Sequence, residues 1–154
     1  LSLDNDAQIF LHGVSMGAAT AMMTSGENLP ENVKGIVEDC GYTSVRDIFA
    51  SELKVRFGLP DFPLMYSMAL VTYLHAGYNI LESSSINQIS KSSIPILVIH
   101  GSADGFTPVD MAYRIKDAVQ TNDFLIVDGA GHAESRFLNP DKYYDTIWNF
   151  LKLH

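Results

Sequence analysis

The chain has 154 residues, of which 47% are hydrophobic, so its length and composition fit one globular domain with a sizeable core. Intrinsic disorder and a small disulfide-stapled scaffold are therefore poor interpretations. Ten basic residues against 18 acidic ones give a net charge of −8, with no local cluster of Lys and Arg, so nucleic acid and anionic membrane surfaces are not expected partners.

The sequence carries weak signals about its compartment. Cys40 is the single cysteine, which excludes an intramolecular disulfide and is consistent with a reducing environment. The longest apolar runs, such as residues 94–99, are too short to cross a bilayer. Since the chain begins Leu1-Ser2-Leu3 without a basic leader, we expect a cytoplasmic protein with no membrane contact from this segment, and leave open an upstream anchor or signal.

Four short runs predict the strands of a parallel sheet that is buried on both faces. Each run is apolar at successive positions instead of alternating, which is typical of such strands. The runs are residues 9–11, 33–37, 94–99 and 124–127. With helices expected between them, the sequence predicts an α/β fold with an open parallel sheet and flanking helices.

Three of the expected helices have recognisable ends or faces. Residues 16–25 are rich in Ala and Met, and Gly26 is placed to end that helix in a left-handed conformation. Thr107-Pro108 and Asn139-Pro140 are typical helix starts. The apolar stripes expected on these two helices are Met111, Ile115, Ala118 and Val119, and then Tyr144, Ile147, Trp148 and Leu151.

The segment between the second and third strands is too long for one crossover. It is rich in Met and aromatic residues, and we expect it to form a helical cap insertion, approximately residues 44–90, over one end of the sheet. Residues 58–60, Gly-Leu-Pro, predict a break within it. Its apolar side chains are candidates for an acyl-binding wall above the site described next.

A candidate nucleophile follows the first strand directly. Gly13-Val14-Ser15-Met16-Gly17 has the G-x-S-x-G pattern of a nucleophile elbow, in the strand-to-helix context that this turn requires. So sharp a turn strains the serine backbone, and we expect both glycines to remove side chains that would clash there. The alternative is a serine that caps the helix between two packing glycines.

A nucleophilic serine needs a base and a carboxylate that orients the base. Asp104 follows the third strand and His132 the fourth, so the chain order is Ser15, Asp104, His132. Because parallel strands share their carboxyl edge, where open α/β sheets bind ligands, we expect one common site. Asp39, also just past a strand, is the alternative acid, and Asp104 and His132 could instead be ordinary turn and loop residues.

The remaining candidates have simpler explanations. We expect His12 and His100 to be structural, and His75 and His154 to be surface or helix residues. Cys40 has no adjoining base pattern and is expected to be a buried apolar side chain. The spacings typical of metal ligands and phosphate loops are absent from the sequence, so we expect neither a metal nor another cofactor.

On these motifs the sequence resembles the α/β-hydrolases, within them the serine esterase and peptidase-like members with a small helical cap. The resemblance extends along the whole chain but covers only the second half of that fold. It implies Ser15 as nucleophile, Asp104 as acid and His132 as base, with the Met16 backbone N–H as one oxyanion-hole donor. Residues 39–44 also look like a subgroup of bacterial hydrolases.

The resemblance implies hydrolysis of a small-molecule carboxylic ester, with amides and thioesters left open, and no cofactor. The family's second oxyanion donor lies in a loop with no counterpart here, and losing one such donor lowers the rate by about 100 to 1,000-fold, so this chain alone is expected to be weak or inactive. The family's central strand corresponds to residues 9–11, so we expect that edge to pair with a missing N-terminal half or with a second copy. The competing hypothesis is a non-catalytic binding or assembly module.

Overall fold

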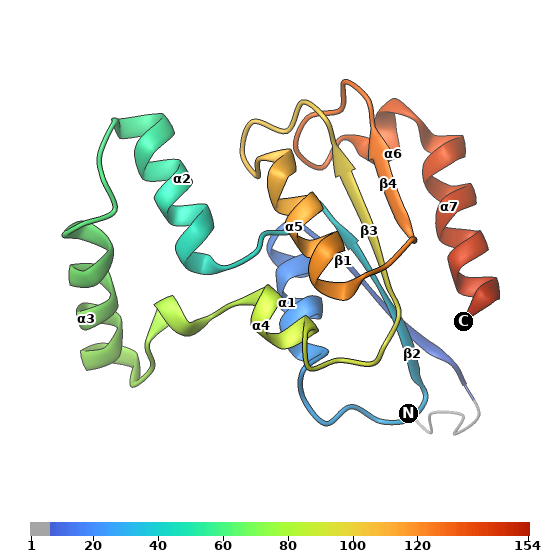
Figure 1. The fold of residues 1–154 in the computed structure, drawn as a ribbon, viewed down its shortest axis with the longest axis horizontal. Helices are drawn as coiled ribbons and strands as arrows, with labels where there is room; N and C mark the ends of the chain where they lie inside the picture. Colours follow the sequence, from blue (N-terminus) through green and yellow to red (C-terminus); the bar gives the residue numbers. More distant parts are fainter. Residues whose placement is uncertain (1–6) are drawn as a thin grey trace.

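The computed structural model describes residues 7–154, which form a four-stranded parallel sheet in the order β1-β2-β3-β4 (Figure 1). The predicted fold class is therefore confirmed. The strands are β1 (Ile9–Val14), β2 (Val33–Asp39), β3 (Ile96–Gly101) and β4 (Phe124–Val127). The first three continue past their predicted carboxyl ends, toward the candidate site residues, and β3 begins later than predicted.

Helices cover both faces of the sheet. Side chains of α1 (Met16–Thr24), α4 (Ser85–Ile89) and α5 (Val109–Val119) form one buried cluster with β2 and β3. On the other face, α7 (Pro140–Leu153), which follows the short α6 (Ser135–Leu138), packs against β2, β3 and β4. Coverage on both sides explains why the strands are apolar at successive positions.

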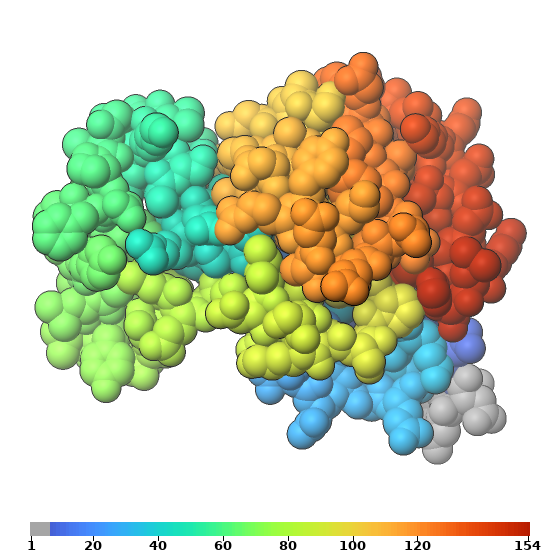
Figure 2. All heavy atoms as spheres, in the orientation of Figure 1, coloured from blue at the N-terminus to red at the C-terminus, as the bar shows by residue number. Residues whose placement is uncertain are grey.

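The insertion forms α2 (Val45–Phe57) and α3 (Leu64–Ala76), followed by the 3-10 turn η1 (Ile80–Glu82). α2 ends at Gly58, which is left-handed with φ of 64°, at the predicted break. In Figures 1 and 2 the two helices stand beside the rest of the molecule as a separate lobe.

The sequence predicts this insertion over one end of the sheet, and in Figure 1 it stands beside α5. The Asp47 carboxylate of α2 accepts a hydrogen bond from the Arg114 guanidinium of α5 at 2.8 Å. The Arg56 guanidinium lies over the Phe106 ring, 5.7 Å from its centre. Polar groups that the hydropathy pattern does not register therefore hold α2 against the flank of α5 and its preceding loop.

Large apolar side chains of this lobe are exposed. Leu70, Tyr73 and Leu74 on α3 are 59%, 59% and 72% exposed. A cavity of about 360 Å³ between α2 and α3 is lined by Phe49, Glu52, Leu53, Phe57, Leu64, Met65 and Met68. No helix within residues 7–154 combines the length and the apolar character needed to span a bilayer.

The end of α1 differs from the prediction. Gly26 is not left-handed, because α1 closes at Ser25 with a helical φ of −64° and an N–H that bonds to the Ala21 carbonyl. A Cβ at position 26 would overlap the side chain of Gln88. A close approach of two segments, rather than a left-handed cap, explains this glycine.

The buried face of α7 is also shifted from the predicted stripe. Tyr143, Ile147 and Phe150 are buried, whereas Tyr144 and Trp148 are about half exposed. Both sets have helical spacing, so periodicity alone does not choose between them. The polar tip of Tyr143 reaches a buried carboxylate of β2, which favours the observed rotation of the helix.

The two glycines of the predicted elbow differ in what they require. A Cβ at Gly13 would overlap the Gly17 carbonyl and the Ala18 backbone, so no side chain fits there. A Cβ at Gly17 meets no described atom within 4 Å. The predicted clash is therefore found at the first glycine and not at the second.

Alanine substitutions in this turn should separate the two glycines. We expect Gly13→Ala to lower the free energy of unfolding by about 3 kcal/mol, because backbone atoms must move to admit the Cβ. Gly17→Ala should change it by less than about 1 kcal/mol, since the residue lies in an open first helical turn. Urea unfolding of both variants measures this. Equal destabilisation would contradict the described turn geometry.

Candidate active site

Ser15 occupies the strained turn between β1 and α1. Its φ of 55° and ψ of −116° lie outside the regions that non-glycine residues favour, a strain of about 1–3 kcal/mol. The Ser15 N–H donates to the Asp39 carbonyl at the end of β2, at 2.8 Å. The Ser15 side chain makes no capping hydrogen bond to α1, which favours the nucleophile-elbow hypothesis over the helix-cap alternative.

The side chain of His132 joins the other two predicted site residues. Its Nε2 lies 2.8 Å from Ser15 Oγ, and its Nδ1 lies 2.8 Å from Asp104 Oδ2. The Ser15 and His132 positions are 117 residues apart in the chain, and those of Asp104 and His132 are 28 apart. The structure thus brings hydroxyl, imidazole and carboxylate into one continuous row.

The Asp104 carboxylate is fully buried and accepts four hydrogen bonds. Oδ1 accepts from the N–H groups of Phe106 and Thr107, both at 2.9 Å, and Oδ2 accepts from the Thr107 hydroxyl at 2.7 Å and from His132. Burial by itself would raise the pKa of Asp104, but these bonds favour the anion and hold the pKa below its ordinary value. Asp104 therefore stays ionised beside the imidazole.

Asp39, the alternative acid, has a different partner. Its Oδ2 accepts a hydrogen bond from the Tyr143 hydroxyl at 3.0 Å, and that hydroxyl lies 3.1 Å from His12 Nε2. Burial raises the pKa of Asp39 to about 6, against the opposing effect of the Tyr143 bond. Asp104, rather than Asp39, is the carboxylate bonded to His132.

Two further residues contact the row and were not singled out for it by the sequence. The Phe106 ring meets the His132 ring edge-on, with centres 4.9 Å apart. The Thr107 hydroxyl, in a position predicted only as a helix start, bonds to Asp104. Cys40 is buried as expected, and burial raises the pKa of its thiol to about 12, so it is no thiolate nucleophile at neutral pH.

The other histidines lie outside the row. His100 is buried and donates from Nε2 to the Thr107 carbonyl at 2.9 Å, and burial lowers its pKa, which keeps it neutral. His75 is exposed on α3. His154 lies 3.4 Å from Asp123 at the opposite end of the sheet. These placements fit the structural and surface roles expected for them.

One group among the described residues could ligate a metal ion. Donor atoms of Cys40, Asp104 and His132 lie within 4.8 Å of one another. The imidazole and the carboxylate are already bonded to each other, and both belong to the row of side chains. The cluster therefore overlaps the row of Ser15, His132 and Asp104, which is the candidate proton relay.

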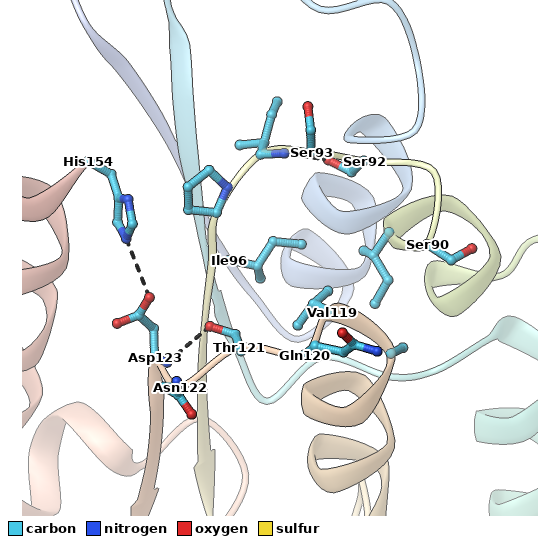
Figure 3. Close-up of a pocket in the computed structure, with 14 residues that line it drawn as sticks. Ser90, Ser92, Ser93, Ile96, Val119, Gln120, Thr121, Asn122, Asp123 and His154 are labelled. Atoms are coloured by element: carbon cyan, nitrogen blue, oxygen red, sulfur yellow. Dashed lines mark hydrogen bonds and ion pairs between the residues drawn. The ribbon is translucent and has the colours of Figure 1, made fainter.

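A polar pocket of about 530 Å³ opens at the other end of the sheet (Figure 3). Its lining includes the start of β3 and the turn before β4, where Asp123 donates from its N–H to Thr121 Oγ1 at 3.0 Å. Open α/β sheets bind ligands at the carboxyl ends of their strands. This pocket is at the amino ends and is separate from the candidate site.

Comparisons with known proteins agree with this fold. Residues 72–143 match the family described as TAP-like protein. The uncharacterized protein YqkD of Bacillus subtilis (strain 168) is 30% identical over 144 residues, which are 93% of this chain and 47% of that protein.

Solved structures extend the comparison. An α/β hydrolase enzyme from the metagenome of Mar Chica lagoon sediments aligns with 96% of this chain and 62% of its own, at 20% identity and a TM-score of 0.64. An esterase of Pyrococcus furiosus aligns with 94% of this chain and 53% of its own, at 21% identity and a TM-score of 0.65. The chain therefore has the α/β-hydrolase fold, as the resemblance implied. It spans about half the length of the curated relative that it matches.

A buried acidic residue lies next to the site, at the end of β2. Glu38 Oε2 accepts a hydrogen bond from the Gly41 N–H at 2.9 Å, while Oε1 has no partner among the described residues. Burial raises the pKa of Glu38 to about 8, so its carboxyl group keeps its proton at neutral pH.

This proton predicts a pH dependence of stability. The folded-state pKa of Glu38 is about 8 and the unfolded value 4.5, so the native state binds the extra proton between these limits. Stability should fall across that window as pH rises, by about 1 kcal/mol per pH unit from this group. Glu38→Gln should remove this slope in urea unfolding at pH 5.5, 7 and 8.5. The control is Glu134→Gln, which alters an exposed carboxylate that accepts the Gly131 N–H. An identical slope in wild type and Glu38→Gln would contradict the buried proton.

Proposed function

We propose that the protein is a serine hydrolase that cleaves carboxylic esters through an acyl-enzyme intermediate. The observation that carries this proposal is the row of hydrogen bonds from Ser15 Oγ to His132 and from His132 to Asp104, each 2.8 Å long. The α/β-hydrolase fold and the similarity to a hydrolase and an esterase of known structure support it. Amide and thioester substrates follow the same chemistry and remain within the proposal.

The proposed reaction has two acyl-transfer steps. His132 Nε2 takes the Ser15 proton as Oγ attacks the ester carbonyl, and the resulting imidazolium returns that proton to the departing alkoxide. A water molecule then attacks the acyl-enzyme by the same route. Asp104 holds the tautomer with a proton on Nδ1 and stabilises the imidazolium. Histidine suits this exchange because its side chain ordinarily titrates near neutral pH.

We further propose the Met16 N–H as one donor to the developing oxyanion. Met16 is the first residue of α1, and N–H groups in a first helical turn have no acceptor within their helix. The positive end of the helix dipole adds to this effect. A second donor would have to come from outside the described residues, which is why we expect the 154-residue chain alone to be weakly active.

The substrate side of the proposal rests on apolar contacts. Phe106 packs edge-on against the His132 ring, and the Arg56 guanidinium of α2 lies over the Phe106 ring. The cavity between α2 and α3 belongs to the same insertion as Arg56 and is lined mainly by apolar side chains. We propose esters of modest size with an apolar acyl group.

A non-catalytic assembly module is the second candidate, and it rests on β1. Within residues 7–154, β1 pairs with β2 and has no neighbour on its other edge. Phe10 and Leu11 on this strand are only partly buried. We propose that this edge pairs either with an N-terminal half of a longer protein or with a second copy of the chain.

Substitutions of Ser15 and of the two candidate acids, Asp104 and Asp39, should separate catalytic from structural roles. In the full-length protein, Ser15→Ala and Asp104→Asn should each lower kcat for p-nitrophenyl butyrate by about 10⁴-fold, because the nucleophile or the required tautomer is lost. Asp39→Asn is the matched control, since an amide oxygen can still accept from Tyr143, and should change kcat less than about 10-fold. Undiminished hydrolysis by Ser15→Ala would overturn the proposed function.

The open edge of β1 gives a separate expectation. The 154-residue chain expressed alone should self-associate as its concentration rises, because an unpaired strand edge offers free N–H and C=O groups. Sedimentation velocity across a concentration series measures this, with the full-length protein as the comparison. A monomer at all concentrations, with cooperative and native-like unfolding, would count against the proposed edge pairing.

A further inference from the structure

Thr107 contacts two members of the candidate proton relay, Asp104 and His132. It precedes Pro108 and α5, and it is fully buried. Its Oγ1 lies 2.7 Å from Asp104 Oδ2, 3.1 Å from His132 Nδ1 and 3.2 Å from the Cys40 carbonyl oxygen. One hydroxyl therefore touches the acid, the imidazole and the end of the neighbouring strand.

The backbone of Thr107 is held from both sides. Its N–H donates to Asp104 Oδ1 at 2.9 Å, and its carbonyl accepts from His100 Nε2 at 2.9 Å. Because both groups and the side chain are bonded, the hydroxyl has little freedom to move away from the carboxylate. Thr107 and Asp104 form one rigid unit.

The hydroxyl has one proton to give and two lone pairs to offer. The 2.7 Å distance makes the Asp104 carboxylate its preferred acceptor over the Cys40 carbonyl. Its lone pairs then face Nδ1–H of His132, which already donates to the same carboxylate oxygen. The tautomer with a proton on Nδ1 thus has two acceptors, and the carboxylate plane is fixed from two directions.

We infer that Thr107 is a positioning residue of the relay, whose hydroxyl locks the Asp104 carboxylate and the Nδ1–H tautomer of His132. This inference rests on the proposed function. A threonine that served only as a packed β-branched residue before a helix could be replaced by valine without consequence, because valine has nearly the same shape.

The matched pair of variants follows from that contrast. Thr107→Val keeps the branched shape and removes the hydroxyl, whereas Thr107→Ser keeps the hydroxyl and removes the methyl group. With p-nitrophenyl butyrate and the full-length protein, Thr107→Val should lower kcat by about 10 to 100-fold with KM changed less than about 2-fold, because small misplacements of catalytic groups have effects of that size. Thr107→Ser should retain kcat within about 3-fold.

A second readout does not depend on activity. In ¹⁵N-histidine NMR of the same proteins, His132 should show the Nδ1–H tautomer in wild type and in Thr107→Ser. Thr107→Val should show an increased fraction of the Nε2–H tautomer. Wild-type kcat and an unchanged tautomer in Thr107→Val would overturn the inference, as would equal losses in the valine and serine variants.

Ser15→Ala, assayed in parallel, separates a failure of the Thr107 inference from a failure of the proposed function. If Ser15→Ala is inactive while Thr107→Val has wild-type kcat and tautomer, the role of Thr107 is refuted and the proposed hydrolase function stands. If Ser15→Ala keeps full activity, the proposed function is refuted. The tautomer measurement then still decides whether Thr107 orients the imidazole.

Discussion

The imidazole of His132 has to meet a hydroxyl and a carboxylate at once, although its strand and the serine strand are at opposite edges of the sheet. Four strands at about 4.8 Å spacing put β1 and β4 about 14 Å apart, so the loop after β4 must turn back across the sheet end. Its path is fixed by the loop after β3, in which the Ala103 N–H donates to the Ala130 carbonyl at 2.9 Å. A side chain at Gly101 would overlap that same carbonyl, so the return of the loop depends on this glycine.

The site is built from groups that are individually unfavourable. Ser15, Cys40 and Ala133 have positive φ values without being glycine, and all three lie at the carboxyl end of the sheet. The carboxyl groups of Glu38 and Asp39, at the end of β2, are buried. Buried polar groups and backbone strain persist only where the surroundings fix them, and here the strand ends and their hydrogen bonds do so. Such concentration of strain is typical of functional sites in proteins.

Much of this organisation could be predicted from the sequence, because it follows from local pattern. Continuous apolar runs reveal strands covered on both faces, and site residues that directly follow such strands must share an edge. Other features depend on which segments meet in space. A side chain at Gly26 would overlap Gln88. The rotation of α7 is favoured by the hydrogen bond from Tyr143 to Asp39. Thr107 is singled out by the hydrogen bond between its hydroxyl and Asp104. None of these contacts leaves a periodic or spaced signature, so sequence patterns could not reveal them.

The central claim is that the Ser15 hydroxyl is activated by His132, and covalent labelling tests it most directly. A fluorophosphonate probe incubated with the full-length protein, followed by peptide mass spectrometry, should place one adduct on Ser15. Labelling should be lost in Ser15→Ala and slowed by orders of magnitude in His132→Ala, because the hydroxyl then lacks its base. An adduct on another residue, or labelling of His132→Ala at the wild-type rate, would contradict the account.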